Sequence, residues 1–402
     1  QTGKLPKVLT IYLKKSLILG LNKKLNTCVI VNRNYPPDHG ATGTSANELA
    51  RFLVTRGIDI KVVCVDGVYE GGGIENNSIC GDIYRIKSFY SGKNKIIRLL
   101  SSLIEGLFLA RKAVSLSPSC IICMTDPPLL NLWVSYYSRK TCRPWIYWSM
   151  DLYPDAFYAA NLVSEKNVFY QLLQNYLQRN LPAGLIALGR NQADFISESF
   201  GEISQKVILP CGVRDLNKSN VVPSWKQNND KIIIGYIGNM GEAHDEKFLT
   251  AVIDSFIPSK YILILSLYGA KADFVIEHAQ GKQGIVFLQN ISLNDLKFID
   301  IHIVTLSPHW DHICVPSKAF SAVSVGCSLI LNGSKESDIY SELIEASWHF
   351  GFGEYNRLKY FFSKIDRIDI EKKQIKALRL SHSFREQKYV SFERIFQMIR
   401  KY

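Results

Sequence analysis

Short apolar runs alternate with amphipathic stretches along the chain from residue 27 onward. Apolar runs of about four to eight residues, separated by helical patterns, are typical of parallel strands that helices bury on both faces. In the first half of the chain this pattern predicts strands at 28–33, 60–65, near 82–88, 120–124, 145–150, 184–188 and 206–210. Helices are expected from about Ser45 to Arg56, near 95–114, near 165–178 and from Arg190 onward.

The polar stretch at 214–230 lacks periodicity and predicts an interdomain linker. A second series of strands is expected at 231–238, 261–269, 284–288, 301–306 and 328–332. Near 388–400 a closing helix carries Phe392, Ile395, Phe396 and Ile399 on one face. The chain is therefore predicted to be an α/β protein with two Rossmann-like, doubly wound domains, at 27–213 and 231–385, followed by the closing helix at 386–402. Because ligands of such folds bind at the carboxyl ends of the strands, the expected site is a cleft between the domains.

Length and composition agree with this division. The 402 residues, 47% of them hydrophobic and 21% charged, suit two globular domains of about 200 residues each. The formal charge of +12 favours a polyanionic ligand, an anionic membrane or nucleic acid. Lys and Arg are dispersed and no zinc-finger or RNA-binding signature is present, so nucleic acid is not an expected partner. The nine cysteines have no framework spacing, which favours a reduced, cytoplasmic setting.

Two segments raise the question of a membrane. Residues 1–26 form a basic extension in which Leu9, Leu13, Leu17 and Leu21 have helical spacing, and it could lie in an anionic interface or pack on the domain. The stretch 93–112 has an apolar stripe flanked by Lys and Arg, which suits either a core-facing helix or a membrane surface; the stripe comprises Leu99, Leu100, Leu103, Ile104 and Leu107. No run of about 20 apolar residues and no signal-peptide pattern occurs, so the expected location is cytoplasmic, with possible peripheral attachment to the inner membrane face.

Two loops after predicted strands carry glycines just before a helix. Gly40 and Gly43 follow the first strand, where glycine lets the backbone approach a ligand and the helix end favours an anion, although a plain turn fits equally well. In the second domain, Gly238 and Gly241 bracket Asn239. Such a loop can cradle a diphosphate, with Asn239 and His244 as side-chain donors, whereas a lone histidine here can also be a surface residue.

A third candidate is a lysine at a helix start. Pro316 and Ser317 open the predicted helix and Lys318 lies in its first turn. A cation at this end is unfavourable because the helix dipole is already positive there. A bound anion would offset the repulsion, while a solvated surface lysine is the simpler alternative.

These pieces together resemble family-4 retaining glycosyltransferases, which have the GT-B fold, and in particular a bacterial subgroup that acts in cell-surface polysaccharide assembly. The resemblance runs from about residue 27 to 400. Its motifs are NYPPDHGATG with ELARFLVTRGIDIKVVCV, DLYPDA (151–156), IALGRNQADFI (186–196), GYIGNMGEAHD (235–245) and VPSKAFSAVSVGCSLIL (315–331).

The resemblance implies that the C-terminal domain binds a nucleotide sugar of the UDP, GDP or ADP type and that the N-terminal domain binds a glycan or lipid-linked acceptor. Lys318 would contact the diphosphate, and the loop after Gly269 with Leu288–Asn290 would line the base pocket. The family's paired glutamates are replaced by Ile313 and Ser321, so Glu336 or Asp338 could take over ribose binding. The full predicted donor site is Gly40, Gly43, Gly238, Asn239, Gly241, Gly269, Leu288, Asn290, Pro316, Ser317, Lys318, Ser321 and Glu336.

The expected chemistry is transfer without metal or cofactor. No Asp-x-Asp motif, which metal-dependent transferases use to hold a divalent ion, occurs in the sequence. Lys318, Asn239 and His244 would then stabilise the leaving diphosphate, and Asp151 would contact the acceptor or the sugar unless it only caps a turn. The predicted catalytic residues are therefore Asp151, His244 and Lys318, with retention implied by the family. A nucleotide-sugar 2-epimerase and an inactive nucleotide-sugar-binding partner are the alternatives.

Overall fold

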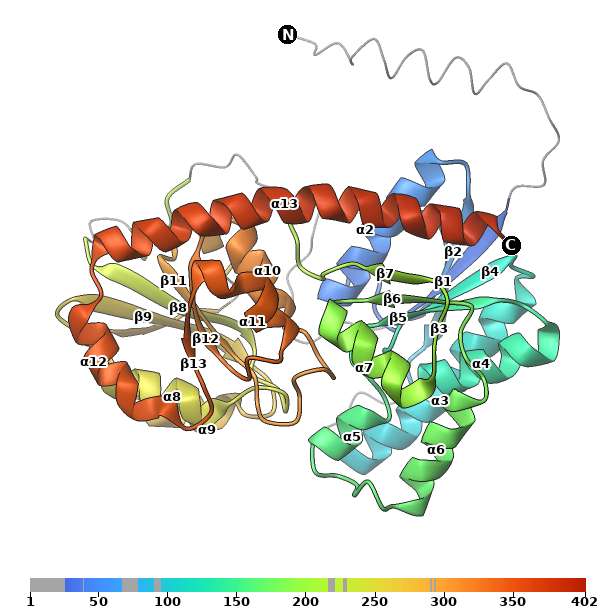
Figure 1. Cartoon of the computed structure of the whole chain (residues 1–402), viewed down its shortest axis with the longest axis horizontal. Helices are drawn as coiled ribbons and strands as arrows, with labels where there is room; N and C mark the ends of the chain where they lie inside the picture. Colours follow the sequence, from blue (N-terminus) through green and yellow to red (C-terminus); the bar gives the residue numbers. More distant parts are fainter. Residues whose placement is uncertain are drawn as a thin grey trace, which may run out of the picture.

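The computed structural model describes residues 26–38, 40–66, 79–89, 95–215, 221–226, 230–289, 291–292 and 294–402. Within them the chain forms two parallel sheets, each covered by helices, and a long carboxyl-terminal helix that runs across both (Figure 1). The predicted α/β, doubly wound class is confirmed. The amphipathic extension expected at the amino end lies almost entirely outside the described residues.

The first sheet has seven strands in the order β3-β2-β1-β4-β5-β6-β7, all parallel. Chain order reverses between β1 and β4, and this switch point is where open α/β sheets bind ligands. Strands β1, β4, β5 and β6 are almost wholly buried, as their continuous apolar runs predict. The bounds are β1 (Thr27–Val31), β2 (Asp59–Asp66), β3 (Asp82–Lys87), β4 (Cys120–Cys123), β5 (Trp145–Ser149), β6 (Gly184–Ala187) and β7 (Lys206–Ile208).

The second sheet has six parallel strands in the order β10-β9-β8-β11-β12-β13, with its switch point between β8 and β11. The strands are β8 (Ile232–Asn239), β9 (Tyr261–Tyr268), β10 (Ile285–Phe287), β11 (Ile301–Thr305), β12 (Ser328–Asn332) and β13 (Ser347–Phe350). The edge strand β13 was not predicted. Its four residues include Ser347 and the half-buried His349, so no apolar run marks it in the sequence.

The helices of the first domain are α2 (Ala41–Thr55), α3 (Lys95–Ser115), α4 (Leu130–Thr141), α5 (Asp155–Ala159), α6 (Val168–Gln178) and α7 (Arg190–Phe200). Those of the second domain are α8 (Glu246–Ser255), α9 (Ala272–Ala279), α10 (Ser317–Ser324), α11 (Asp338–Leu343) and α12 (Arg357–Lys364). Helix α13 (Arg367–Arg400) closes the chain. In the described part of the chain, no helix has the length and apolarity needed to cross a membrane.

Helix α3 packs with its apolar stripe turned away from the sheet. Leu99, Leu100 and Ile104 are exposed and Leu103 and Leu107 are half-buried, so the expectation of a core-facing stripe is wrong. The buried face instead carries one large apolar side chain, Leu109, among small and polar ones: Ser101, Ser102, Glu105, Gly106, Ala110 and Ala113.

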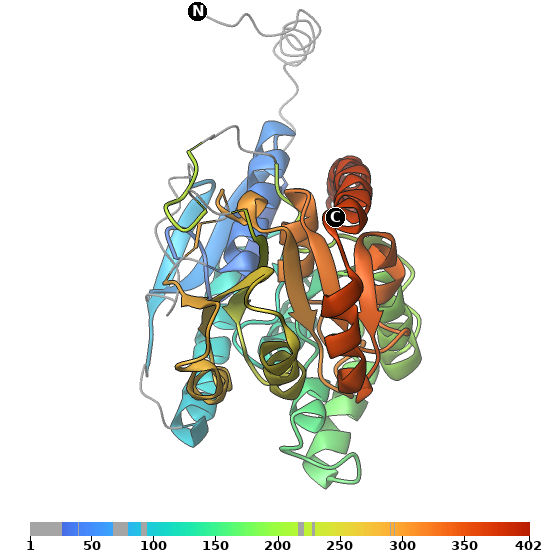
Figure 2. The same cartoon turned by 90° about the vertical axis from the view of Figure 1, so that its left-hand side faces the viewer.

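Helix α13 is much longer than predicted. The closing helix was expected near 388–400, but it begins at Arg367, where the Asp366 carboxylate accepts a hydrogen bond of 2.9 Å from the backbone N–H of Asp369. Its first half is largely polar and exposed, which hid it from an apolar pattern. Viewed along the molecule, α13 appears end-on beside the two domains (Figure 2). It contacts α10 and β12 of the second domain and then α2 and β7 of the first.

The second half of α13 anchors the two domains to each other. Phe392 is 4% exposed and its ring lies 5.4 Å from that of Phe52 on α2. The Ser391 hydroxyl donates to the carbonyl of Ile208 at 2.6 Å. One hydrophobic cluster includes buried side chains of both sheets as well as this end of α13, so the domains share a continuous core.

We expect Phe392→Ala to lower the free energy of unfolding by about 3–5 kcal/mol, because it leaves a cavity between α13 and α2. Chemical denaturation followed by circular dichroism measures the change. Val390→Ala on the same helix is the matched control, since Val390 is 52% exposed, and its effect should stay within about 0.5 kcal/mol. Equal losses in the two variants would contradict the packing role of Phe392.

Candidate active site

The loop after β8 is tied to the end of β11 at the switch point of the second sheet. The ring Nδ1 of His244 lies 2.7 Å from the carbonyl oxygen of Thr305. The backbone N–H of Asp245 donates to the Thr305 hydroxyl at 3.2 Å, and that of Ser307 donates to the Ala243 carbonyl at 2.8 Å. The segment 238–245 is therefore held at the place where this fold class binds ligands.

Lys318 reaches from the first turn of α10 to this loop. Its ammonium group donates to the Tyr236 hydroxyl at 2.7 Å and to the Asn239 carbonyl at 2.6 Å, and it lies 4.3 Å from the centre of the Tyr236 ring. Burial lowers the pKa of Lys318 to about 7. The interpretation of Lys318 as a solvated surface lysine is therefore wrong.

His244 is buried rather than exposed, so its alternative interpretation as a surface residue is also wrong. Burial, with a contribution from the positive charge of Lys318, lowers the pKa of His244 well below its ordinary value, and the ring is neutral. A carbonyl oxygen can only accept, so the Nδ1 facing Thr305 carries the proton and Nε2 is left as an acceptor. In this state Nε2 can accept from a hydroxyl, and the expected role of His244 as a donor to the diphosphate stays a prediction.

The glycines of the second domain make room for Asn239. A Cβ on Gly269 would lie 2.1 Å from the Asn239 side-chain oxygen, and one on Gly241 would lie 3.1 Å from its nitrogen. Gly269 and Gly238 also have φ of 113° and 122°, which disfavour any other residue. A Cβ on Gly238 would lie 3.8 Å from Cε of Lys318, so the glycine turn and the start of α10 are in contact.

The start of α10 also contacts the end of the first domain. Pro316 precedes α10 without a side-chain cap, and Ser317 is its first residue. The hydroxyl of Ser321 donates to the Gly212 carbonyl at 3.0 Å, and a Cβ on Gly212 would lie 2.3 Å from the Ser317 carbonyl oxygen. Ser321, predicted in the donor site, thus has its hydroxyl engaged with the chain between the domains.

Gly40 and Gly43 lie at the start of α2. Gly40 is its extended N-cap residue, and a Cβ on Gly43 would lie 3.0 Å from the Asn34 carbonyl oxygen, so Gly43 permits close backbone packing. The Cys211 thiol lies 3.3 Å from the Ser45 hydroxyl on α2. Since Cys211 directly precedes Gly212, the starts of α2 and α10 lie on either side of this dipeptide.

Asp151 lies where the first domain meets the segment before α10. It forms an isolated antiparallel bridge with Cys314, and the backbone N–H of Leu152 donates to the Ile313 carbonyl at 2.9 Å. Asp151 is exposed as a residue, yet desolvation by the protein atoms around its carboxyl raises its pKa to about 6, and the negative charge of Asp126 adds to the shift. Among the described residues its carboxylate has no hydrogen-bond partner, which argues against a turn-capping role.

The sequence analysis missed Asp126. This residue lies three positions after the end of β4, at the switch point of the first sheet, and its carboxylate accepts a hydrogen bond of 2.7 Å from the Asn34 side chain. Burial raises its pKa to about 6 as well. The signal was an acid two residues after the buried run CIICM, obscured because the following prolines read as a turn. Asp126 and Asp151 form a pair of interacting carboxylates on neighbouring strand ends.

Asp338 does not fit a role in ribose binding. Its buried carboxylate accepts hydrogen bonds of 2.9 Å from the backbone N–H groups of Asn191 and Gln192, at the start of α7 in the other domain. A Cβ on Gly189 would lie 2.0 Å from the Asp338 carboxyl carbon, so the two positions fit closely. Glu336 is exposed beside this contact, and its carbonyl accepts from the Asn191 side chain at 2.6 Å.

The base pocket expected near Leu288 is only partly described. Leu288 is half-buried and its N–H donates to the Leu265 carbonyl at 3.0 Å, while Asn290 lies outside the described residues. Among described side chains there is no group of three or more His, Cys, Asp or Glu that could hold a metal ion.

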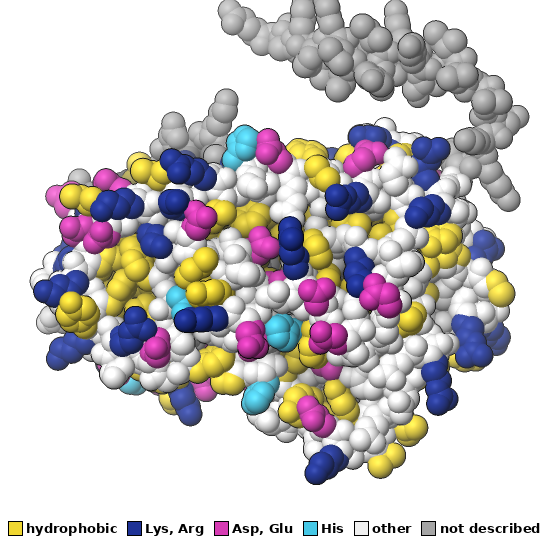
Figure 3. All heavy atoms as spheres, viewed as in Figure 1, with side chains coloured by type: hydrophobic (Ala, Val, Ile, Leu, Met, Phe, Trp, Pro, Cys, Tyr) yellow, Lys and Arg dark blue, Asp and Glu magenta, His cyan; other side chains and the backbone are white. Residues whose placement is uncertain are grey.

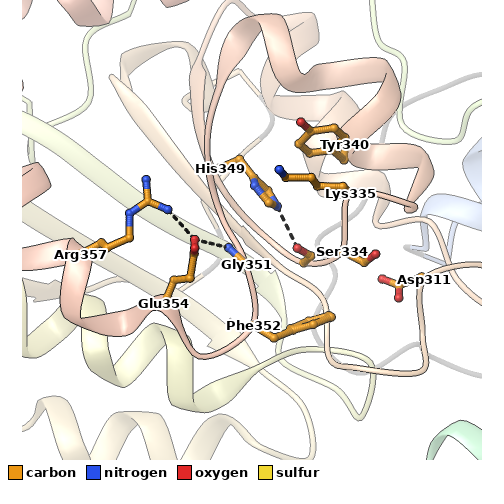
Figure 4. Close-up of a pocket in the computed structure, with 10 residues that line it drawn as sticks. Asp311, Ser334, Lys335, Tyr340, His349, Gly351, Phe352, Glu354 and Arg357 are labelled. Carbon is orange, nitrogen blue, oxygen red and sulfur yellow. Dashed lines mark hydrogen bonds and ion pairs between the residues drawn. The ribbon is translucent and has the colours of Figure 1, made fainter.

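A cavity of about 460 Å³ opens at the ends of β12 and β13 (Figure 4), and of the predicted site residues only Glu336 adjoins its lining, next to Lys335. Arg357 and Glu354 pair at 2.6 Å on one side, and His349 contacts the Gly333 carbonyl on the other. The lining residues are Asp311, Gly333, Ser334, Lys335, Tyr340, His349, Gly351, Phe352, Glu354 and Arg357.

The sequence matches no family model and no curated protein. Among solved structures, sucrose-phosphate synthase from Thermosynechococcus elongatus aligns with 94% of this chain and 98% of its own, at a TM-score of 0.70 and 12% identity. The chain has the GT-B fold. WaaG, a glycosyltransferase involved in lipopolysaccharide biosynthesis, aligns at a TM-score of 0.64 and 13% identity over 92% of this chain and 99% of its own. Anabaena HepE in complex with UDP-glucose aligns at a TM-score of 0.63 and 13% identity, over 91% of this chain and 98% of its own. The predicted GT-B architecture is confirmed, while membership of family 4 stays a prediction.

The lowered pKa of Lys318 predicts how nucleotide binding changes with pH. In the free protein Lys318 is charged below about pH 7 and neutral above it, and an anionic diphosphate favours the charged form. The affinity for UDP, GDP or ADP should therefore fall as pH rises from 6 to 8.5, as calorimetric titration would measure. Lys318→Met should bind more weakly at pH 6 and lose most of this dependence. A Lys318→Met variant with the same profile as the parent would contradict the assignment.

Proposed function

We propose that this GT-B protein transfers a sugar from a nucleoside diphosphate sugar to a glycan or lipid-linked acceptor. The observation that carries the proposal is the contact between the end of β8 with the glycine-bearing turn after it (238–241) and the cationic start of α10, at the switch point of the second sheet. Both elements favour an anion, the turn through its backbone and the helix start through free N–H groups and its dipole.

Lys318 is suited to stabilise the leaving diphosphate. Tyr236 and Asn239 accept two of its three N–H groups, and both acceptors are uncharged. The third N–H and the full positive charge are therefore available to a phosphate oxygen. In the proposed step the bond between sugar and diphosphate breaks while charge develops on the diphosphate next to Lys318. The acceptor oxygen forms its bond to the anomeric carbon on the face from which the diphosphate departs, which retains the configuration. A β-phosphate oxygen accepts the proton of the acceptor hydroxyl, so no protein nucleophile, metal or cofactor is used.

The acceptor is assigned to the first domain. Asp126 and Asp151 lie at the ends of neighbouring strands there, and Asp151 is bridged to Cys314, four residues before Lys318. Through this bridge an acceptor hydroxyl at Asp151 is brought close to the start of α10. Asp151 is proposed to orient that hydroxyl, and the neutral His244 to accept from a hydroxyl of the donor sugar.

Solved GT-B structures support the donor class. HepE holds UDP-glucose or UDP, and an E. coli protein named for trehalose-6-phosphate is bound with UDP-2-fluoro glucose. By analogy with these proteins and with WaaG we propose a nucleotide-sugar donor and a role in cell-surface polysaccharide assembly at the cytoplasmic side of the membrane. The base, the sugar and the linkage follow from experiment.

An inactive nucleotide-sugar-binding protein is the second candidate. Ile313 and Ser321 stand where the resembled family has its two glutamates, and the Ser321 hydroxyl is already bonded to Gly212. Incubation with a panel of UDP, GDP and ADP sugars, with product analysis by NMR, separates the possibilities. Released nucleotide and free sugar indicate a transferase, an inverted sugar carbon indicates an epimerase, and tight binding without turnover indicates the inactive protein.

With an active donor, Lys318→Ala should lower turnover about 100-fold or more, because the leaving diphosphate loses its cation. Lys372→Ala removes the same charge from a side chain that is 71% exposed on α13, and it should leave turnover unchanged. Nucleotide release measured at saturating donor gives the turnover rate of each variant. Turnover of Lys318→Ala within twofold of the parent would show that this lysine does not stabilise the leaving group.

The raised pKa of Asp151 predicts an acidic limb in the pH profile. The carboxyl stays protonated until about pH 6, so a role for its ionised form requires kcat/KM to rise with pH through that value. Asp151→Asn should remove the limb. Asp126→Asn should move it to lower pH, because the charge of Asp126 no longer opposes ionisation of Asp151.

Asp155→Asn is the control for this profile. Asp155 also has a pKa raised to about 6 by burial, but its carboxylate accepts hydrogen bonds from Tyr170 and Gln174. Its substitution should preserve the limb. A limb that persists in Asp151→Asn would overturn the assigned role.

A further inference from the structure

The cavity at the ends of β12 and β13 is separate from the proposed diphosphate site. Its volume is about 460 Å³, and its walls come mainly from the turns after these two strands and from Asp311 in the segment before α10. In the second sheet β12 and β13 are two and three strands away from β8, or about 10 and 14 Å at the ordinary strand spacing. The cavity therefore offers space for a group other than the diphosphate.

Lys335, Arg357 and His349 bring hydrogen-bonding groups to this cavity. Lys335 is exposed and has no hydrogen-bond or ion-pair partner among the described residues. Arg357 pairs through one nitrogen with Glu354 at 2.6 Å, and its side chain is 58% exposed, so its other N–H groups are available. The Gly333 carbonyl can only accept, so Nε2 of His349, at 2.9 Å, carries a proton, and Nδ1 of the neutral ring is an acceptor.

Asp311 brings an unsatisfied acceptor. The backbone N–H of Ser334 donates to its carboxylate, but its Oδ1 is buried and has no hydrogen-bond partner in the part of the chain that the structure describes. A buried acceptor of this kind at a cavity wall is explained by a donor that the ligand supplies. The carboxylates of Asp311 and Glu354 also balance the charges of Lys335 and Arg357. The cavity thus lacks the excess of positive charge that would favour a phosphate or a second nucleotide.

Phe352 adds an apolar surface to these polar groups. It lies between Gly351 and Gly353 in the turn after β13, and it is 37% exposed. Its ring borders the cavity on the side opposite Tyr340 and Lys335 (Figure 4). A sugar ring has C–H groups that pack on an aromatic face, and hydroxyls at its edge that both donate and accept. The lining therefore matches a carbohydrate.

The cavity also lies next to the domain junction. Asp311 is three residues before Cys314, which is bridged to Asp151, so the Cα atoms of Asp311 and Cys314 are at most about 11 Å apart. On another side Lys335 directly precedes Glu336, whose carbonyl accepts from the Asn191 side chain of the first domain at 2.6 Å.

The surface around the junction suits a neutral ligand. On the face shown in Figure 3, Asp, Glu and His side chains gather where the two domains meet, and Lys and Arg form no continuous basic surface there. We propose that the cavity binds a neutral sugar residue of the acceptor glycan, beside the residue whose hydroxyl reacts at Asp151. This inference rests on the proposed function, and it makes the acceptor an oligosaccharide that contacts both domains.

The test uses the full chain and an array of bacterial glycans, without donor. The parent should bind neutral oligosaccharides, and excess UDP, GDP or ADP should not displace them. Phe352→Ala and Asp311→Asn should each weaken binding at least tenfold, because the first removes the stacking surface and the second replaces the carboxylate. The matched control is Tyr389→Ala, which removes an aromatic ring that is 56% exposed on α13 and does not line the cavity. It should bind like the parent.

A parent that binds no glycan, unchanged binding in both cavity variants, or an equal loss in Tyr389→Ala would overturn the proposal. Displacement of the glycan by a nucleotide would also overturn it, because the sugar would then occupy the donor site. A preference for phosphorylated or acidic glycans would contradict the neutral ligand. Thermal melting checks that all three variants fold.

Kinetics separate this site from the proposed function. With an active donor, Phe352→Ala should raise the KM for an oligosaccharide acceptor at least tenfold and leave kcat and the donor KM within twofold. A transferase with an unchanged acceptor KM in this variant would refute the sugar site alone. Glycan binding that depends on Phe352 in a parent that releases nucleotide from no donor would refute the transferase and keep the sugar site.

Discussion

The site depends on one lysine ammonium group, that of Lys318, which lies at the switch point of the second sheet. In the described structure it has no carboxylate partner. Lys318 is held over Tyr236 and against the Asn239 carbonyl, and its burial is costly enough to bring its pKa to about 7. A folded protein keeps a desolvated cation where something repays the cost, and a perturbed pKa at such a place is typical of a functional site. The glycine-bearing end of β8 and the start of α10 meet at this charge, and the charge adds to the burial that keeps His244 neutral.

The two domains are joined by several contacts of different kinds. The end of α13 buries Phe392 against α2, Ser321 binds the Gly212 carbonyl, and Asp338 at the start of α11 caps α7 of the first domain. A continuous apolar core accompanies these polar contacts. These contacts bring Asp126 and Asp151 of the first domain and Lys318 of the second toward the same domain junction. Neither domain could form this arrangement alone.

Continuous apolar runs were sufficient to predict nearly every strand and the GT-B architecture, because buried parallel strands need apolar residues on both faces. The local sequence pattern failed to predict elements whose existence or orientation depends on contacts with residues distant in the sequence. The strand β13 is too short and polar to be recognised, the first half of α13 has no apolar stripe, and α3 turns its stripe outward because Glu105 must meet Arg33. In the site, Lys318 was found from its unfavourable place at a helix start. Asp126, the acceptor character of His244 and the capping role of Asp338 depend on neighbours distant in sequence.

Gly189 of the first domain and Asp338 of the second pack so closely that the residue at one position limits which residue fits at the other. Residue 189 has no space for a side chain because the Asp338 carboxylate occupies that position. A longer glutamate at position 338 would in turn clash with the backbone of Gly189. A chimera that combines one domain of this protein with the complementary domain of another GT-B protein would therefore need both residues from the same parent. Exchange of either alone would place a clash or a gap at the seam, whatever the quality of the separate folds.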